Sequence, residues 1–453
     1  MNLPNYFLAD LPGEATLGTM MIVEACQTLK RNREKYLRGR STANIVQLLS
    51  ELGANWLRPD FPFRQLAMEH GPAETGFSVP VLTAGLDAFF RQLTRDNLQA
   101  LLLQELGHAQ RIDILSATAE EQKSQRAALV SGPEMLVHIS AGSIPNPAIL
   151  NIVLGLLLRS AQLVKCARGA ALLPRLFAHS LYEADPKIAA CLELASWRGG
   201  NTALETAVFN EADCVTATGS DETLSKIRQH VPPKVRFLGY GQRVSFGYVA
   251  RGASSGSGAG ATLVAAGNDI VAWNQLGCLS PHVIYVEHGG GLSAESLAEL
   301  LAKELARREE SDPRGPVAAE TAATIASRRG FYEVRAAHSP ETRHWCSKDS
   351  TAWTVIYEAN PQFQLSCLNR FIYVKGVANL TEALQSADSV LGKVSTVGLA
   401  APEGKATELA TQLARWGVTR VCPLGQMQNP PLTWRHDGRP ALGDLVTWTD
   451  WEM

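Results

Sequence analysis

The sequence predicts an α/β protein built from two successive units, each with a sheet covered by helices. Three observations support this prediction. The first 130 residues carry only helical periodicity, short apolar runs alternate with helical segments from Met135 onward, and a second alternating unit follows a Gly/Ser-rich stretch at 253–260. Strands alternating with helices are typical of a parallel sheet with helices on both faces.

The N-terminal region is expected to be mostly helical. Ser41 and Thr42 are N-cap candidates, and Gly53 is the expected break in the helix that follows. Three apolar stripes at helical spacing are expected to pack in a core: Ile45, Leu48, Leu49, Leu52 and Trp56; Phe89, Phe90 and Leu93; and Leu98, Leu101, Leu102 and Leu106 ahead of Gly107.

The first α/β unit is expected between Met135 and Arg243. Its strands are expected at Met135–Ser140, Leu163–Ala167, Cys214–Thr218 and Val235–Leu238. Its helices are expected at Pro147–Arg159, Leu173–Ala184, Thr202–Ala212 and Asp221–Gln229. Such a sheet is the usual cradle for a dinucleotide, although no Gly-x-Gly-x-x-Gly follows the first strand. We therefore expect a Rossmann-type domain without the common fingerprint.

The second unit begins after 253–260, which is expected to be a flexible surface loop. Its expected elements are a helix at Ala265–Leu276, a strand at His282–Glu287, a helix at Ala294–Arg308, strands at Thr354–Tyr357 and Arg370–Val374, helices at Leu380–Ala387 and Ala406–Trp416, and a strand after Val418. The tail from Gln426 is rich in Pro, Trp and Asp and is expected to dock on a surface.

Composition excludes several classes of protein. A net charge of −2 without a dense basic run gives no attraction for nucleic acid. The N-terminus lacks the pattern of a signal peptide, and the one long apolar segment, Pro147–Val164, is interrupted by polar residues and predicts a buried helix. The eight cysteines are scattered without a Cys-x-x-Cys pair, which predicts no metal site and reduced thiols in a cytoplasmic protein.

Cys278 has the most distinctive setting of these cysteines, within Asn274-Gln-Leu-Gly-Cys-Leu-Ser-Pro281. It follows an expected helix and precedes an expected strand. Gly277 permits close approach of the backbone to the sulfur, and Pro281 stiffens the exit. A thiolate there can attack a carbonyl group while a neighbouring N–H supports the oxyanion. The alternative is a small buried hydrophobic residue.

These residues resemble the aldehyde dehydrogenase superfamily and, more closely, the acyl-CoA reductases of the LuxC type, which supply long-chain aldehyde to bacterial luciferase. The resemblance runs from about Leu136 to Glu452, and the first 130 residues carry little of it. Besides the thiol segment it is carried by His138-Ile-Ser-Ala-Gly-Ser-Ile-Pro145, Gly155-Leu-Leu-Leu-Arg-Ser-Ala161 with Lys165, Asn268-Asp269, Trp353-Thr-Val-Ile-Tyr357, Leu368-Asn-Arg370 and Thr396-Val-Gly-Leu399.

The resemblance implies roles for individual residues. Cys278 matches the nucleophile that forms a thioester with the acyl group. Lys165 matches a lysine near the adenosine ribose, and a cation there favours the 2′-phosphate of NADPH, with NADH as the alternative. A solvated lysine at a strand end remains the other interpretation. Thr218-Gly219-Ser220 resembles a turn whose backbone N–H groups bind pyrophosphate at a helix start.

Two departures from the superfamily pattern bear on mechanism. Counting back from Lys165, Ser143 occupies the position where an asparagine usually donates to the oxyanion, and Asn146 is the substitute candidate. The Glu-Leu-Gly-Gly segment, whose carboxylate activates water, is replaced by Arg236-Phe-Leu-Gly-Tyr-Gly-Gln-Arg243. A thioester on Cys278 should therefore wait for reduction, unless Glu205 or Glu287 fills that space.

Three histidines near these motifs offer further alternatives. His282 and His288 follow Cys278, but Pro281 disfavours a helical Cys–His pairing, so a structural or solvent-facing role is expected for both. His138 ends a buried strand, and the sequence favours equally a packing role and a place in the lining of the site.

Together, these inferences predict an aldehyde-dehydrogenase-like protein with a helical and cofactor-binding domain (1–243), a catalytic domain carrying Cys278 (244–425) and a docking tail (426–453). The resemblance implies reduction of an acyl-CoA or other acyl thioester to the aldehyde, by a homo-oligomer working with an acyl-activating partner enzyme. The alternatives are an acyltransferase without a redox step and a non-catalytic scaffold.

Overall fold

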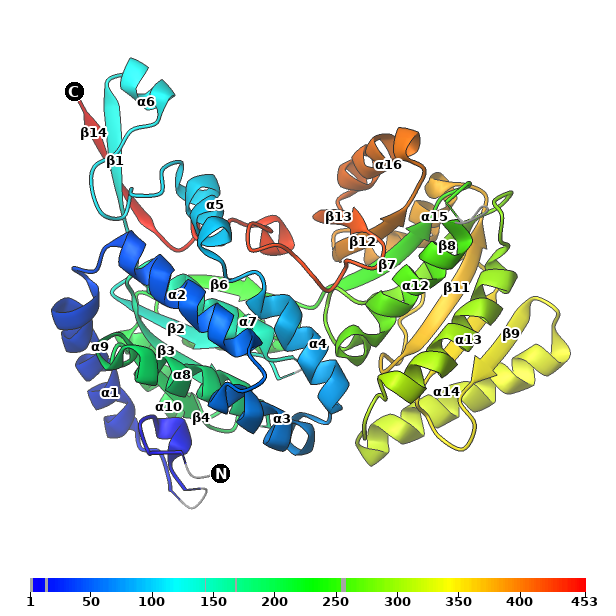
Figure 1. Cartoon of the computed structure of the whole chain (residues 1–453), viewed down its shortest axis with the longest axis horizontal. Helices are drawn as coiled ribbons and strands as arrows, with labels where there is room; N and C mark the ends of the chain where they lie inside the picture. The colour runs from blue at the N-terminus through cyan, green and yellow to red at the C-terminus, as the bar shows by residue number, and fades with distance from the viewer. Residues whose placement is uncertain (1–2, 13–14, 143, 168, 254–257) are drawn as a thin grey trace.

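The chain folds around two large sheets and a small two-stranded one (Figure 1). This computed structural model describes residues 3–12, 15–142, 144–167, 169–253 and 258–453. In that part of the chain, one large sheet has five strands and the other has seven. The five-stranded sheet and the N-terminal helices occupy one side of the molecule, and the seven-stranded sheet occupies the other.

The five-stranded sheet is parallel throughout and has the order β4-β3-β2-β5-β6. Its strands are β2 (Met135–Ile139), β3 (Ala161–Cys166), β4 (Leu192–Ser196), β5 (Cys214–Thr218) and β6 (Arg236–Tyr240). Strands β3 and β4 follow one another on one side of β2, and strands β5 and β6 follow one another on its other side. The strand order therefore reverses between β2 and β5, and ligands of such sheets bind beyond the carboxyl ends at this point.

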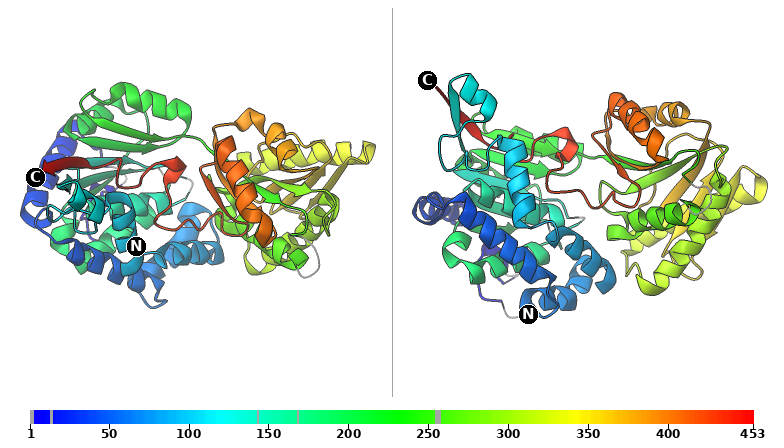
Figure 2. Two further views of the ribbon diagram at one scale, coloured as in Figure 1. Left: turned by 90° about the horizontal axis from the view of Figure 1, so that it is seen from above. Right: turned by 45° about the horizontal axis from the view of Figure 1, so that its top comes forward.

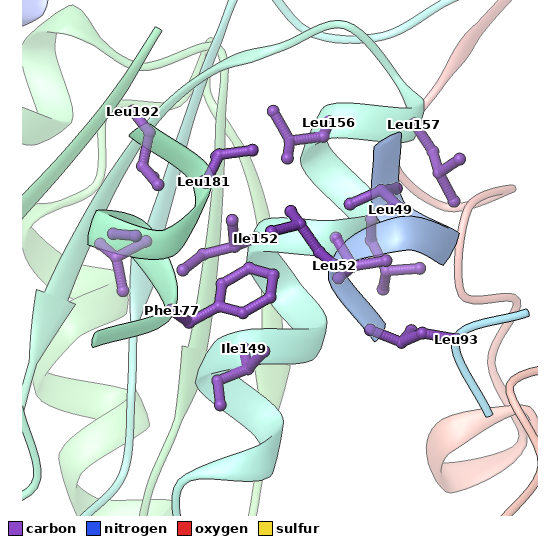
Figure 3. Packing of buried hydrophobic residues seen from close by; sticks show 14 of the residues in the cluster. Leu49, Leu52, Leu93, Ile149, Ile152, Leu156, Leu157, Phe177, Leu181 and Leu192 are labelled. Atoms are coloured by element: carbon purple, nitrogen blue, oxygen red, sulfur yellow. The ribbon is translucent and has the colours of Figure 1, made fainter. Parts of the chain in front are cut away.

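Both faces of this sheet are buried, which explains its uninterrupted apolar strands. Successive residues point to opposite faces, so Leu136 packs in one core and Val137 in the other. The connecting helices are α7 (Asn146–Leu157), α8 (Leu172–Ala184), α9 (Pro186–Ala189), α10 (Thr202–Glu211) and α11 (Asp221–His230). Figure 3 shows Ile149 and Ile152 of α7 beside Phe177 of α8, in the core that also contains Leu136.

The N-terminal region is helical, as predicted, and it covers the α7 and α8 side of the sheet. Its helices are α1 (Thr19–Asn32), α2 (Thr42–Leu57), α3 (Pro62–Thr75), α4 (Val79–Phe90), α5 (Arg95–Leu106) and α6 (Ala119–Lys123), of which α1 packs on the opposite face. Ser41 caps α2 by accepting from the N–H of Asn44. The break predicted at Gly53 is wrong: α2 continues through it, and a Cβ there would lie 2.7 Å from Leu93.

The seven-stranded sheet has the order β13-β12-β7-β8-β11-β10-β9, with β9 antiparallel at one edge. Its strands are β7 (Val244–Val249), β8 (Pro281–Glu287), β9 (Thr342–Cys346), β10 (Thr354–Glu358), β11 (Phe371–Val377), β12 (Val394–Ala400) and β13 (Arg420–Pro423). Its helices are α12 (Gly258–Val271), α13 (Ala294–Ser311), α14 (Ala319–His338), α15 (Leu380–Ser386) and α16 (Glu403–Trp416). Helices α12 and α13 pack on one face, and α14, α15 and α16 contribute to the core on the other.

Two predictions near the thiol segment are wrong. The loop expected at 253–260 is already helical from Gly258, where α12 begins, and 254–257 lie outside the described residues. The helix expected to reach Leu276 ends at Val271. A short turn, Ala272–Gln275, follows, in which Trp273, Asn274 and Gln275 are left-handed, with φ of 49°, 50° and 65°.

The C-terminal tail crosses from the seven-stranded sheet to the N-terminal side of the molecule (Figure 2). Met427 packs in the core beneath α12, whereas Leu432, Leu442 and Leu445 belong to the core around α7. The tail ends in β14 (Thr447–Glu452), which pairs antiparallel with β1 (Arg126–Ser131). No described helix has the length and apolar character that a membrane span requires.

Candidate active site

The loop that carries Cys278 is held rigidly by buried amides. Asn274 donates to the carbonyl of Arg314 at 2.8 Å and accepts from the Arg370 guanidinium at 3.0 Å and 3.2 Å. Gln275 donates to the carbonyls of Pro281 and Phe371. These contacts offset the cost of left-handed backbone, about 1–2 kcal/mol for each residue. They also join the thiol segment to Leu368-Asn-Arg370, another stretch that carried the resemblance.

Cys278 opens onto a cavity at the start of β8, and it is the one exposed cysteine of the eight, all of which are described. Ser245 at the start of β7 donates to its carbonyl at 2.8 Å and accepts from the N–H of Thr396 in β12. The Cys278 side chain is exposed at the cavity, with protein packed around the rest of the loop. The surrounding protein and the charge of Asp437 raise the pKa of the Cys278 thiol to about 12, and Arg243 opposes that rise.

Gly277 is needed for a reason other than the predicted approach of backbone to sulfur. A Cβ at this position would lie 2.5 Å from Nε2 and 2.7 Å from Oε1 of Gln428, a residue of the tail. The Gln428 amide donates to the Ser280 hydroxyl. The tail is therefore packed directly against the loop that presents Cys278.

The cavity beside Cys278 has a volume of about 150 Å³ and a mainly apolar wall. Its apolar lining comes from α4, α7, the Cys278 loop and the tail: Ala88, Phe89, Ile144, Pro147, Leu150, Leu154, Trp273, Leu279, Pro430, Pro431, Leu432, Trp434 and Ala441. Its polar lining consists of Gln92, Asn146, Asn151, Thr218, Tyr240, Gln428, Asn429 and His436. None of these described lining residues is a carboxylate.

Neither carboxylate considered as a substitute base lines this cavity. Glu287 ends β8, about 20 Å from Pro281 at the rise of a strand, and it accepts from Tyr248 and from the N–H of Arg251. Glu205 accepts from the N–H of Gly200 and interacts with the charge of Lys165. In β6, Phe237 packs toward the core that contains α10 and α11, and Leu238 packs toward the opposite core.

Asn146 lies at the first turn of α7 and lines the cavity with Cys278. Its amide donates to the carbonyl of Gly85 in α4 over a long 3.4 Å bond, and its Oδ1 is buried without a partner among the described residues. The Asn146 amide group is therefore held by one long hydrogen bond, and it lines the same cavity as the Cys278 thiol. Ser143, the other candidate oxyanion donor, lies outside the described residues.

Three predicted cofactor residues lie at or just after the carboxyl end of β5, and the fourth lies near the carboxyl end of β3, which β2 separates from β5. Thr218 ends β5 beside the point where the strand order reverses, and Gly219 and Ser220 lead into α11. Ser220 caps α11 by accepting from the N–H of Thr223 at 3.2 Å. A helix start at this edge suits a pyrophosphate, because its first N–H groups and its dipole face the ligand.

Lys165 lies near the end of β3 and is 8% exposed, so a solvated strand-end lysine is the wrong interpretation. Burial lowers the pKa of Lys165, and the charge of Glu205 opposes that shift. A partly buried cation beside a carboxylate fits a ribose with or without a 2′-phosphate.

The histidines predicted near the site have structural partners. His138 is buried, and its ring nitrogens lie 2.7 Å from Thr216 Oγ1 and 3.2 Å from Gln162 Oε1, so it packs within the sheet. His282 lies 3.0 Å from Ser366 Oγ. No described group of three His, Cys, Asp or Glu residues is arranged to hold a metal ion.

Sequence reasoning missed the contribution of the tail to the site. Asp269, in the Asn268-Asp269 motif, is buried and accepts from the N–H groups of Gly425 at 2.5 Å and Met427 at 2.8 Å. This anchor sets the path by which Gln428 and His436 reach the cavity. The Asn268-Asp269 motif was the available signal for this contact, but Gly425, to which Asp269 binds, lies more than 150 residues away in sequence.

Comparison with known proteins establishes the fold and the family. PutA from Anabaena variabilis, assigned as an aldehyde dehydrogenase, superposes with a TM-score of 0.72 at 14% identity, covering 96% of this chain and 93% of that one. A NAD-dependent benzaldehyde dehydrogenase from Corynebacterium glutamicum gives 0.69 at 13% identity, covering 99% and 94%. The predicted aldehyde-dehydrogenase-like α/β fold is thus confirmed.

The family model described as acyl-CoA reductase (LuxC) matches residues 37–448, and the chain belongs to this family. A long-chain acyl-protein thioester reductase from Aliivibrio fischeri is 23% identical over 70% of this chain and 63% of its own length. One from Photorhabdus laumondii is 21% identical over 90% of this chain and 82% of its own. The family match starts well before Leu136, which corrects the expectation that the first 130 residues carry little of the resemblance.

Proposed function

We propose that this protein reduces an acyl thioester, most simply a fatty acyl-CoA, to the aldehyde through a covalent acyl group on Cys278. One observation carries the proposal: the one exposed cysteine opens into an apolar cavity that also reaches Thr218 and Tyr240 at the carboxyl edge of the cofactor-type sheet. The relatives named long-chain acyl-protein thioester reductase support the same reaction class.

In the proposed mechanism, the Cys278 sulfur attacks the thioester carbonyl and expels the carrier thiol. The Asn146 amide, or Ser143 as predicted from the sequence, donates a hydrogen bond to the oxyanion. When bound at the five-stranded sheet, a nicotinamide cofactor supplies the hydride that makes the reaction a reduction. The Cys278 sulfur then leaves as the thiolate as its bond to the carbonyl carbon breaks, and the product aldehyde departs.

The apolar wall of the cavity favours a fatty acyl chain. Leu150 and Leu154 of α7, Phe89 of α4 and Leu432 of the tail surround the space beside the thiol. Each buried CH₂ of a substrate contributes about 0.8 kcal/mol of binding free energy in such surroundings. None of the described lining residues is a carboxylate that could activate water against an acyl group on Cys278.

The cofactor is proposed to be NADPH, with NADH as the alternative. Lys165 offers a cation for a 2′-phosphate, whereas Glu205 beside it offers an acceptor for a free 2′-hydroxyl. Thr218, Gly219 and Ser220 are proposed to hold the pyrophosphate at the start of α11. The chain is proposed to divide into cofactor (1–243), catalytic (244–425) and tail (426–453) regions.

The cellular setting is proposed on chemical grounds. All eight cysteines are free, which suits the reducing cytoplasm. We also propose that the protein is a homo-oligomer and that it receives activated acyl groups from a partner enzyme.

The test incubates the purified protein with acyl-CoAs of graded chain length, together with NADPH or NADH, and identifies the products. We expect aldehyde, cofactor consumption in step with coenzyme A release, and loss of both in Cys278→Ala. Release of coenzyme A without cofactor consumption would instead identify an acyltransferase. Normal turnover by Cys278→Ala would overturn the proposed nucleophile, and absence of acyl labelling in the wild type would indicate a scaffold.

A further inference from the structure

His436, a residue of the tail, lies in the wall of the cavity onto which Cys278 opens. Its ring stacks on Tyr240 at the end of β6, with centroids 4.6 Å apart and planes 9° from parallel. Trp434 packs against the ring at 4.8 Å. The side chain is 31% exposed, so the two aromatic residues fix the imidazole while leaving part of it open.

Charged groups show that this part of the tail approaches the thiol. Asp437 follows His436 directly, and its charge is one of the influences on the pKa of Cys278. Arg243 lies in the β6–β7 connection, with its Nε 3.3 Å from Oδ2 of Asp437. Its positive charge lowers the pKa of both Cys278 and His436. The Ser395 hydroxyl of β12 donates to the Asp437 carboxylate at 3.3 Å. The tail segment around His436 therefore contacts the seven-stranded sheet through Ser395 and the five-stranded sheet through Tyr240.

The charged and titratable groups around His436 come from three segments. Tyr240 belongs to β6, Arg243 to the connection after it, and Asp437 and Arg439 to the tail itself. Burial lowers the pKa of His436, Arg243 and Arg439 lower it further, and Asp437 opposes them. The imidazole is consequently neutral at neutral pH and able to accept a proton.

The site needs such an acceptor. Because the surrounding protein and the charge of Asp437 raise the pKa of the Cys278 thiol, little of it is thiolate at pH 7 without help. Of the described residues lining the cavity, His436 is the one imidazole, and burial raises the pKa of the Tyr240 hydroxyl to about 12. The remaining polar lining is amide, indole and hydroxyl.

We propose that His436 is the proton-transfer group for acylation of Cys278, an inference that rests on the proposed function. The imidazole takes the proton from Cys278 Sγ as the sulfur forms its bond to the thioester carbonyl carbon. It returns that proton to the carrier sulfur when the carbonyl carbon–carrier sulfur bond breaks. Thiol and thioester thus become thioester and thiol, and His436 ends as it began.

The experiment measures Cys278 acylation by dodecanoyl-CoA without cofactor, from pH 6 to pH 10, in wild type and His436→Gln. General base assistance contributes about 100- to 10,000-fold, so we expect acylation of the variant to be at least about 100-fold slower at pH 7. Hydroxide replaces the missing base as pH rises, so the deficit should shrink about tenfold per pH unit. His338→Gln, at the exposed end of α14, is the control and should match the wild type.

A second variant separates proton transfer from packing. His436→Ala leaves space where the ring stacked on Tyr240, and added imidazole should restore acylation at pH 7, at least tenfold above the rate without it. A deficit that stays constant with pH and resists imidazole in both variants would make His436 a packing residue and overturn the inference. Equal rates in wild type and His436→Gln would overturn it too. Failure of the wild type to become acylated would instead refute the proposed function.

Discussion

Gly277→Ala tests whether the tail positions the reactive thiol. The new Cβ would lie 2.5 Å from Nε2 of Gln428, whereas nonbonded atoms settle at about 3.5 Å, so either the Gln428 side chain turns away from Ser280 or the loop and the tail move apart by about 1 Å. Such a displacement at a reacting group costs about 100-fold in rate. Overpacking of this kind also lowers the free energy of unfolding by about 1–3 kcal/mol.

The assay for this variant is the rate of Cys278 acylation by an acyl-CoA, with thermal unfolding measured in parallel. Gly330→Ala is the matched control, because a Cβ at Gly330 within α14 meets no atom within 4 Å. Adding Gln428→Ala to Gly277→Ala removes the conflicting atoms and should recover at least about tenfold. Acylation of Gly277→Ala at the rate of Gly330→Ala would refute the idea that the tail fixes the position of the loop.

Three further predictions concern the cofactor, the oxyanion and water. Lys165→Met should weaken NADPH binding more than NADH binding, because only NADPH offers a 2′-phosphate to the lost cation; titration with both cofactors checks this, and equal weakening would restrict Lys165 to the ribose. If Ser143 donates to the oxyanion, Ser143→Asn should keep or raise the reduction rate and Ser143→Ala should lower it, about 100-fold for a lost donor; the reverse order would transfer the role to Asn146. Isolated acyl-Cys278 should release free acid far more slowly without cofactor than it is reduced with it; release as fast as reduction would mean that another group activates water.

Much of the secondary structure near the cofactor edge could be predicted from sequence. The four strands expected in the first unit are present to within two residues at each end, because strands buried on both faces are uninterrupted apolar runs. Strand β4 (Leu192–Ser196) was missed, since Glu193 interrupts its run. That carboxylate is tolerated because it accepts from the N–H of Leu8, and burial raises its pKa to about 7.

The second unit was predicted less completely. Strands β7, β9 and β12 were missed, and β7 and β12 each contain a glycine that weakens the strand pattern. The glycine in β12, Gly398, is explained only by the tail, since a Cβ there would lie 2.6 Å from Met427 Sδ. Helix α14 was missed because Ile325 and Tyr332 are its only described buried residues, too few for an apolar stripe.

The path of the thiol loop could not be predicted, because distant contacts outweigh local preference there. Trp273 and Gln275 are unfavourable in the left-handed region, so the sequence favoured a helix continuing to Leu276. Trp273 is held by α4, where a Cβ on Gly85 would lie 2.1 Å from its ring. The N-terminal helices thus shape the thiol loop directly, which agrees with a family match that begins at residue 37.

The sequence predicted Cys278 as the nucleophile, but it did not predict the surroundings of its thiol. A superfamily carboxylate is missing from β6, and the structure places no described carboxylate on the cavity wall to replace it. The wall beside the end of β6 is instead completed by the tail, through Trp434 and His436. Asp269 anchors this tail from more than 150 residues away. Because this aromatic and apolar wall offers no described carboxylate to activate water, we expect the tail that carries His436 also to slow hydrolysis of the proposed thioester on Cys278.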